Sequence, residues 1–180
     1  MSGTWMRLLV IASAALAAPA VEVGAQCTAS GAGGTCNLPG SVSMTAGRVV
    51  LLQMSATSTT LTPPAPTDFD AGYNTTTGPT FTVSANAAWS LSLRSATALW
   101  SATNTSPGTP ARTNKPAADL RWSTVAGGAY APLTVGDVGL VNGVATPGSA
   151  TTLYLRTLYD WTLDTPGNYS LSIVLTLTSP

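Results

Sequence analysis

Apolar and polar residues alternate along much of the chain, most clearly between residues 169 and 178. Large apolar side chains occupy every second position there, with mainly serine and threonine between them. The apolar positions are Tyr169, Leu171, Ile173, Leu175 and Leu177. A period of two residues is typical of a strand that buries one face, and small hydroxyl side chains suit the other face. The segment therefore predicts a half-buried strand.

The same period recurs elsewhere in the chain. It is found at residues 81–85, at residues 89–93 after a break at Asn86, at residues 120–123 and at residues 153–161. Residues 48–54 are apolar at neighbouring positions instead, which predicts a strand buried on both faces. Stretches rich in Pro, Gly, Asn and Thr separate these segments, and no segment has sustained helical periodicity. We therefore expect an all-β fold, an antiparallel two-sheet sandwich of immunoglobulin-like or Greek-key type with about seven to nine strands.

A turn precedes the strand at residues 169–178. Pro166 followed by Gly167 favours a type II turn, and Tyr169 at the start of the strand resembles the tyrosine corner of Greek-key sandwiches. The immunoglobulin order would place another strand after this one, and none is predicted. We therefore expect either a different topology or an uncovered sheet edge, which would invite pairing with another chain.

Residues 1–25 carry the features of a secretory signal peptide. Arg7 precedes an apolar run over residues 8–18, which is too short to span a bilayer as a stable helix. Small residues follow and allow cleavage after Ala17, Ala20 or Ala25, of which Ala25 is favoured. We therefore expect a protein that is exported to the cell surface or the periplasm and is not integral to the membrane.

Charged residues are few and balanced. The sequence has seven Lys and Arg residues and seven Asp and Glu residues, and the predicted signal peptide holds one of each sign, Arg7 and Glu22. The remaining charges are scattered and form no basic stripe for phosphates. Nucleic acid is therefore not an expected partner.

Two cysteines, Cys27 and Cys36, lie in a glycine-rich segment that follows the predicted signal peptide. An exported protein meets an oxidising environment, so we expect a disulfide between them that pins an N-terminal arm over residues 26–40. The β-sandwich domain is then expected over residues 41–180. Zinc would need more ligands than two thiols, and the sequence contains no His, so no metal site is predicted.

Few residues could carry catalysis. Without His the chain cannot form a Ser-His-Asp or Cys-His arrangement, and its only lysine, Lys115, is expected in a loop. Asp160 and Asp164 bracket a Trp and could act as paired acids on a sugar, but Asp near turns usually caps backbone amides. We therefore expect no enzymatic activity and no cofactor.

Tryptophan side chains could bind the flat face of a sugar. Trp89 and Trp161 are in phase with apolar neighbours and are expected in the core. Trp100 is the least constrained and is the first candidate for a binding surface. Together with Asp160 and Asp164, these three tryptophans make up the candidate ligand-binding residues.

Three sequence stretches, from Trp89 to the end of the chain, resemble the WxL-type surface domains of Gram-positive bacteria. Trp89-Ser90-Leu91 matches the first W-x-L motif of that family, and residues 159–167 and the ending "LTLTSP" are similar in character. Leu175 stands where the family has its second Trp, and Trp161-Thr162-Leu163 lies one strand earlier. The resemblance implies non-covalent attachment to the cell wall.

The chain is also similar in general character to the exported β-sandwich pilins of bacterial surface fibres, which are poor in charge and are completed by a donated strand. We therefore expect a non-catalytic bacterial surface protein that binds a cell-wall or surface polysaccharide. The alternative is a fibre subunit that assembles with other copies of itself by strand addition.

Overall fold

The computed structural model describes residues 28, 30–38, 40–105 and 108–180. The predicted signal peptide and Cys27 lie outside these residues. The chain divides into two units, residues 1–45 and residues 46–180, and each is considered by itself. The described part of the first unit contains no helix or strand, and its apolar side chains are exposed, with Val42 102% and Met44 88% exposed.

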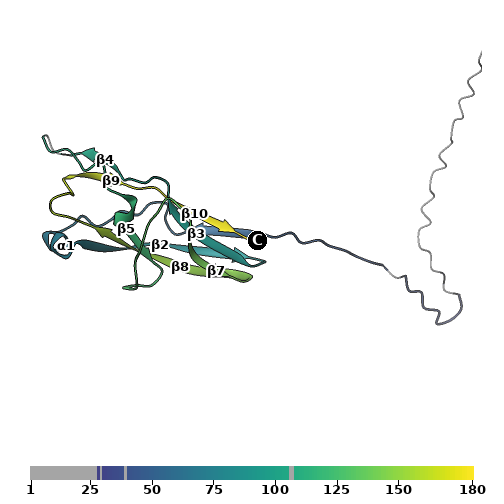
Figure 1. Cartoon of the computed structure of the whole chain (residues 1–180). Coiled ribbons are helices and arrows are strands. Elements are labelled where there is room, and N and C mark those ends of the chain that lie inside the picture. The colour runs from purple at the N-terminus through teal and green to yellow at the C-terminus, as the bar shows by residue number, and fades with distance from the viewer. Residues whose placement is uncertain (1–27, 29, 39, 106–107) are drawn as a thin grey trace, which may run out of the picture. The chain divides into compact units, whose positions relative to one another are not determined.

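The larger sheet of the second unit has five strands. In spatial order they are β1 (Val50–Met54), β2 (Tyr73–Ala85), β8 (Thr146–Leu158), β5 (Leu120–Ser123) and β6 (Ala131–Pro132). All neighbours in this sheet are antiparallel. Strands β2 and β8 are 13 residues long each and pair with one another, and Figure 1 shows them side by side.

The smaller sheet has three antiparallel strands, in the order β10 (Ile173–Thr178), β3 (Trp89–Ser95) and β7 (Val138–Gly143). A further antiparallel pair joins β4 (Ser101–Asn104) to β9 (Gly167–Ser170). It follows the β3–β10 pair after a short stretch without regular strand pairing. Figure 1 shows β4 and β9 at the end of the molecule that also carries α1. Ten strands are thus found among the described residues, slightly more than the sequence predicts.

Side chains from both sheets meet in one core, so the predicted antiparallel sandwich is confirmed. Phe81, Val83 and Leu153 come from the larger sheet, and Leu91 and Leu93 come from the smaller one; each is at most 1% exposed. The alternation at 81–85, 89–93 and 153–157 therefore marks the faces that the sequence predicts. The immunoglobulin-like order of strands stays a prediction.

The expectation that residues 48–54 form a strand buried on both faces is wrong. Strand β1 pairs only with β2 and lies at the edge of the larger sheet. Its side chains are largely exposed, with Leu51 51% exposed. Consecutive apolar residues are buried on both sides only where other layers of structure cover both faces of the sheet, and most side chains of β1 remain exposed.

The described residues also contain two short helices that the sequence did not reveal. They are α1 (Pro66–Ala71) and the 3-10 helix η1 (Ala117–Asp119). A helix of six residues is less than two turns long and cannot show a repeating apolar face. Among the residues that the structure describes, no helix is long and apolar enough to cross a membrane.

Candidate functional site

The candidate site is built on α1 and on the loop between β8 and β9, residues 159–166, which we call the Trp161 loop. Pro66 begins the helix at a position where its missing N–H costs nothing. The Asp68 carboxylate accepts a hydrogen bond from the Ala65 N–H at 2.7 Å. Gly72 ends the helix with φ of 78°, a conformation that glycine adopts without strain. The helix thereby holds Phe69 and Asp70 beside the loop.

The Trp161 loop begins with a tight turn at Asp160. One oxygen of its carboxylate, Oδ1, accepts hydrogen bonds from the Thr162 hydroxyl at 2.6 Å, the Thr162 N–H at 2.7 Å and the Leu163 N–H at 3.1 Å. The bond from the Thr162 hydroxyl, followed by the bonds from the backbone, lowers the pKa of Asp160 below its ordinary value of 3.8. Asp160 therefore caps the turn in its ionised form.

Trp161 is exposed and yet held in place. Its indole is 59% exposed and stacks on the Phe69 ring, with the ring centroids 4.6 Å apart and the planes 27° from parallel. The indole Nε1–H also donates a hydrogen bond to Asp70 Oδ1 at 3.0 Å. Phe69 in turn contacts Tyr159, with ring centroids 5.4 Å apart. The stacking partner and the hydrogen bond together fix the orientation of the indole plane.

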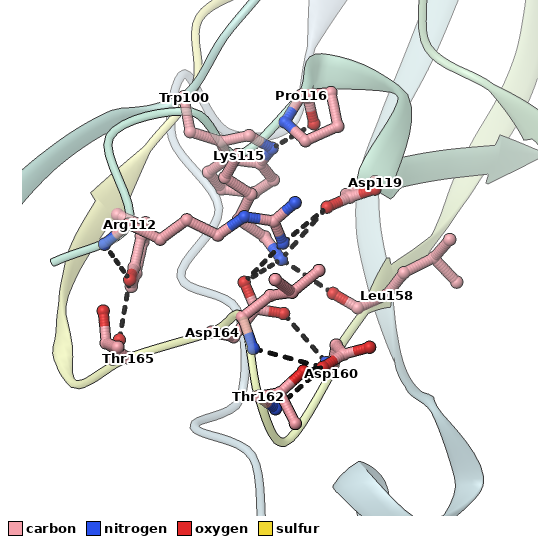
Figure 2. Close-up of polar contacts among 12 residues, drawn as sticks. Trp100, Arg112, Lys115, Pro116, Asp119, Leu158, Asp160, Thr162, Asp164 and Thr165 are labelled. Carbon is pink, nitrogen blue, oxygen red and sulfur yellow. Dashed lines mark hydrogen bonds and ion pairs between the residues drawn. The ribbon is translucent and has the colours of Figure 1, made fainter.

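The far side of the loop is anchored by buried charges, which Figure 2 shows converging on Asp164. Asp164 Oδ1 accepts from Lys115 Nζ at 2.8 Å and from Arg112 at 3.0 Å, while its Oδ2 accepts from the Asp160 N–H at 2.9 Å. The side chain of Lys115 is 3% exposed and that of Asp164 is 6% exposed. Asp119 in η1 completes the group, 3.3 Å from Arg112 and 3.4 Å from Lys115.

Lys115 also binds the end of strand β8, because its Nζ donates to the Leu158 carbonyl at 2.8 Å. The same ammonium lies 5.4 Å from the centre of the Tyr159 ring. Burial raises the pKa of Tyr159 above its ordinary value of 10.0, and the nearby Asp164 carboxylate adds to this effect. The buried charges therefore fix both ends of the segment from Leu158 to Asp164, with Trp161 at its tip.

The structure reverses the expected roles of two tryptophans. Trp100 is 6% exposed, and its indole donates a hydrogen bond to the Pro116 carbonyl at 3.1 Å (Figure 2). It therefore packs in the core, and the expectation that it is the least constrained tryptophan is wrong. Trp161, which was expected in the core, is exposed because β8 ends at Leu158, before the alternation does. Trp89 is 3% exposed and lies in the core as expected.

The two candidate acids are near each other but are already occupied. Asp164 is buried and paired with two cations, and the Asp160 carboxylate is bound to Thr162 and Leu163. Asp68 and Asp70 are likewise bound, to backbone and side-chain N–H groups. These contacts are those of turn and helix caps. No group of three or more His, Cys, Asp or Glu that could hold a metal ion is found in the part of the chain that the structure describes.

The tyrosine near the Pro-Gly turn ties the loop to the segment before η1. The Tyr169 hydroxyl donates to the Thr165 carbonyl at 2.6 Å and accepts from the Arg112 N–H at 2.9 Å. Gly167 does not have a positive φ, so the expected type II turn is not formed. A Cβ at Gly167 would lie 2.5 Å from the Ala111 Cβ, and the glycine is therefore needed for close packing. Pro166 is exposed beside it.

The predicted disulfide stays a prediction, because Cys27 lies outside the described residues.

Comparisons with protein-family models and with curated proteins found no match for this chain.

Proposed function

We propose that the protein is a non-catalytic, exported surface protein that binds a cell-wall or surface polysaccharide through Trp161. The observation that supports this most strongly is an exposed indole held by two independent contacts, the Phe69 ring and the Asp70 carboxylate. A flat aromatic ring covers the C–H face of a sugar, and a ring that is already oriented loses little freedom on binding.

The polar surroundings of the indole support the same proposal. Asp70 accepts a hydrogen bond from the indole and Asp160 precedes Trp161 in the chain, and each has one carboxylate oxygen without a protein hydrogen bond among the described residues. Such oxygens can accept hydrogen bonds from sugar hydroxyls. Loops held by a rigid scaffold are common carriers of binding residues, and the buried Lys115–Asp164 pair gives this loop its support.

The experiment is co-sedimentation of the purified protein with isolated cell walls, measured as the fraction bound over a range of wall concentrations. Trp161→Ala should reduce retention about fivefold or more, because removing an aromatic side chain on which a nucleobase stacks costs about 1–3 kcal/mol, and we expect a sugar face on Trp161 to lose a similar amount. Val144→Ala is the matched control, since Val144 is 76% exposed and lies at the opposite end of β8. Equal retention of wild type and Trp161→Ala would refute the proposal.

A second candidate function, assembly of a fibre by strand addition, is favoured by one specific observation. Strand β10 lies at the edge of the smaller sheet, pairs only with β3 and contains no charged residue. Natural edge strands usually carry charges or bulges that prevent pairing. Residues 41–46 of the same chain alternate polar and apolar, with Val42 and Met44 exposed, and a second copy could add this segment to β10.

Sedimentation velocity of the protein without walls tests this candidate. Thr176→Lys would place a charge on the outer face of the edge strand and should abolish self-association, as should Val42→Asp. Ser92→Lys is the matched control, because Ser92 pairs with Thr176 on the same face but belongs to the central strand β3. A wild-type protein that stays monomeric at high concentration would refute assembly and leave polysaccharide binding untouched.

A further inference from the structure

Two arginines face each other on the outer surface of the larger sheet. Arg121 in β5 is the direct partner of Arg156 in β8. Their neighbours along each strand, Trp122 and Leu155, are 8% and 5% exposed and point into the core. Since side chains alternate along a strand, both arginines project outward from the same side of the sheet.

This arginine pair has no counter-ion among the residues that the structure describes. Three other cations of the sandwich are paired with carboxylates: Arg94 with Asp137, and the buried Arg112 and Lys115 with Asp119 and Asp164. Within the described residues neither Arg121 nor Arg156 makes an ion pair, and the Nε atom of each is buried without a hydrogen-bond partner. Like charges directly opposite on neighbouring strands are unfavourable, and so are buried donors without an acceptor.

The Arg156 guanidinium makes cation–π contacts with two aromatic rings. It lies 4.3 Å from the centre of the Tyr73 ring and 4.1 Å from the centre of the Tyr130 ring. Contacts with two ring faces restrict the position of the guanidinium. The donor group is therefore restrained before any ligand arrives.

A small groove lies beside this pair. Its volume is about 230 Å³, and it is lined by Thr75, Thr76, Thr77, Tyr130 and Tyr154 together with Ala126 and Gly127. Thr75 is the direct partner of Arg156 on strand β2. The groove is smaller than a site for a drug-sized ligand, about 300–1,000 Å³, and its lining is dominated by hydroxyl groups that can both donate and accept hydrogen bonds.

We propose that Arg121 and Arg156 bind the carboxylate of an acidic sugar, a uronate unit of a polysaccharide, whose ring lies in this groove. A carboxylate matches the planar fork of a guanidinium and would offset one of the two positive charges while lying close to both arginines. The threonine and tyrosine hydroxyls suit the hydroxyl groups of a sugar ring. The site consists of residues other than the Trp161 loop, so the inference does not depend on the function proposed for that loop.

Calorimetric titration of the full chain with trigalacturonate tests the inference, with the neutral galactotriose as the comparison ligand. Arg121→Gln and Arg156→Gln should each weaken trigalacturonate binding about tenfold or more, because each removes charge-assisted hydrogen bonds. Arg48→Gln is the matched control for the loss of one positive charge, and its affinity should stay within twofold of wild type. Arg121→Lys keeps the charge without the planar fork and should still weaken binding. Thermal unfolding of each variant shows that it is folded.

Four results would overturn the proposal. The first is that wild type does not bind trigalacturonate, and the second is that galactotriose binds as tightly. The third is that Trp161→Ala abolishes trigalacturonate binding while Arg156→Gln does not, which would move the carboxylate to the Trp161 loop. The fourth is that inorganic phosphate or a tetra-aspartate peptide binds at the arginine pair more tightly than trigalacturonate, which would change the class of ligand.

Discussion

At the residue scale, Gly143 in β7 shows how one missing side chain sets the packing of the core. A Cβ at this position would lie 2.7 Å from an indole carbon of Trp89, which is closer than van der Waals contact allows. The Trp89 indole then donates to the carbonyl of the next residue, Val144, at 2.9 Å. The indole therefore occupies the space that any other residue at 143 would fill.

Gly143→Ala is expected to destabilise the protein by about 1–3 kcal/mol, the usual cost of overpacking a core. The free energy of unfolding in urea measures this. Gly139→Ala is the matched control in the same strand, because no atom lies within 4 Å of a Cβ there. Neither glycine has a positive φ, so backbone strain does not contribute to the comparison. Equal effects of the two substitutions would contradict this account.

Asp160 gives a prediction about pH at the same scale. Its pKa in the folded protein lies below 3.8, so the caps that it provides are present above about pH 4 and are lost as the pH falls through its folded pKa. Thr162→Val removes the strongest of these contacts and should raise the pKa of Asp160 toward 3.8. Titration of the carboxyl carbon by NMR measures the change. An unchanged pKa would show that the backbone N–H groups suffice.

At the element scale, the Lys115–Asp164 pair joins two segments that are far apart in the sequence, residues 112–119 and the Trp161 loop. Arg112 and Lys115 precede η1, Asp119 ends η1, and Asp164 belongs to the Trp161 loop. The side chains of Lys115 and Asp164 are nearly inaccessible, so removing either of them leaves the group of two cations and two carboxylates with one buried charge in excess.

Lys115→Met should therefore cost about 3 kcal/mol or more in the free energy of unfolding. Arg94→Gln breaks an exposed ion pair with Asp137, whose N···O distance is 3.7 Å and whose side chains are 37% and 54% exposed. That substitution should cost less than about 1 kcal/mol. Urea unfolding of both variants under the same conditions measures the difference, and a similar cost for the two would contradict the structural role of the buried pair.

The elements that the sequence predicts well are those with one buried and one exposed face. Alternation identified β2, β3, β5, β8 and β10, because the period of two follows directly from the geometry of a half-buried strand. The run of consecutive apolar residues at β1 did not predict its exposure, since a local pattern does not report which parts of the fold cover a strand. Alternation failed at Trp161, where it continues for three residues past the end of β8.

The binding residues were only partly predictable for the same reason. Asp160 and Trp161 were named as candidates, but the contact of Trp161 with Phe69 depends on α1, a helix too short to leave a sequence pattern. The pairing of Arg121 with Arg156 depends on the register between β5 and β8, and these strands are not neighbours in the sequence. Both arrangements require the tertiary fold.

At the scale of the whole molecule, the core belongs entirely to the second unit. All of its buried and partly buried members lie between Leu52 and Leu177. A protein that begins at Ala46 should therefore unfold at the same temperature as the full chain and with the same dependence on urea, since the surface exposed on unfolding is unchanged. Calorimetry and urea titration measure both quantities. A lower midpoint would show that residues 1–45 contribute to the stability of the sandwich.

The pairing of β2 with β8 has a consequence for when this protein can fold. The hydroxyls of Thr80 and Thr152, 2.9 Å apart in the folded sheet, belong to residues separated by 72 positions in the chain. Ser90 and Thr178, joined across β3 and β10, are separated by 88 positions. Sheets built from such distant partners close slowly, typically in milliseconds to seconds. During synthesis the central strands must therefore wait for partners that are made much later, so the sheets can close only when most of the chain is available.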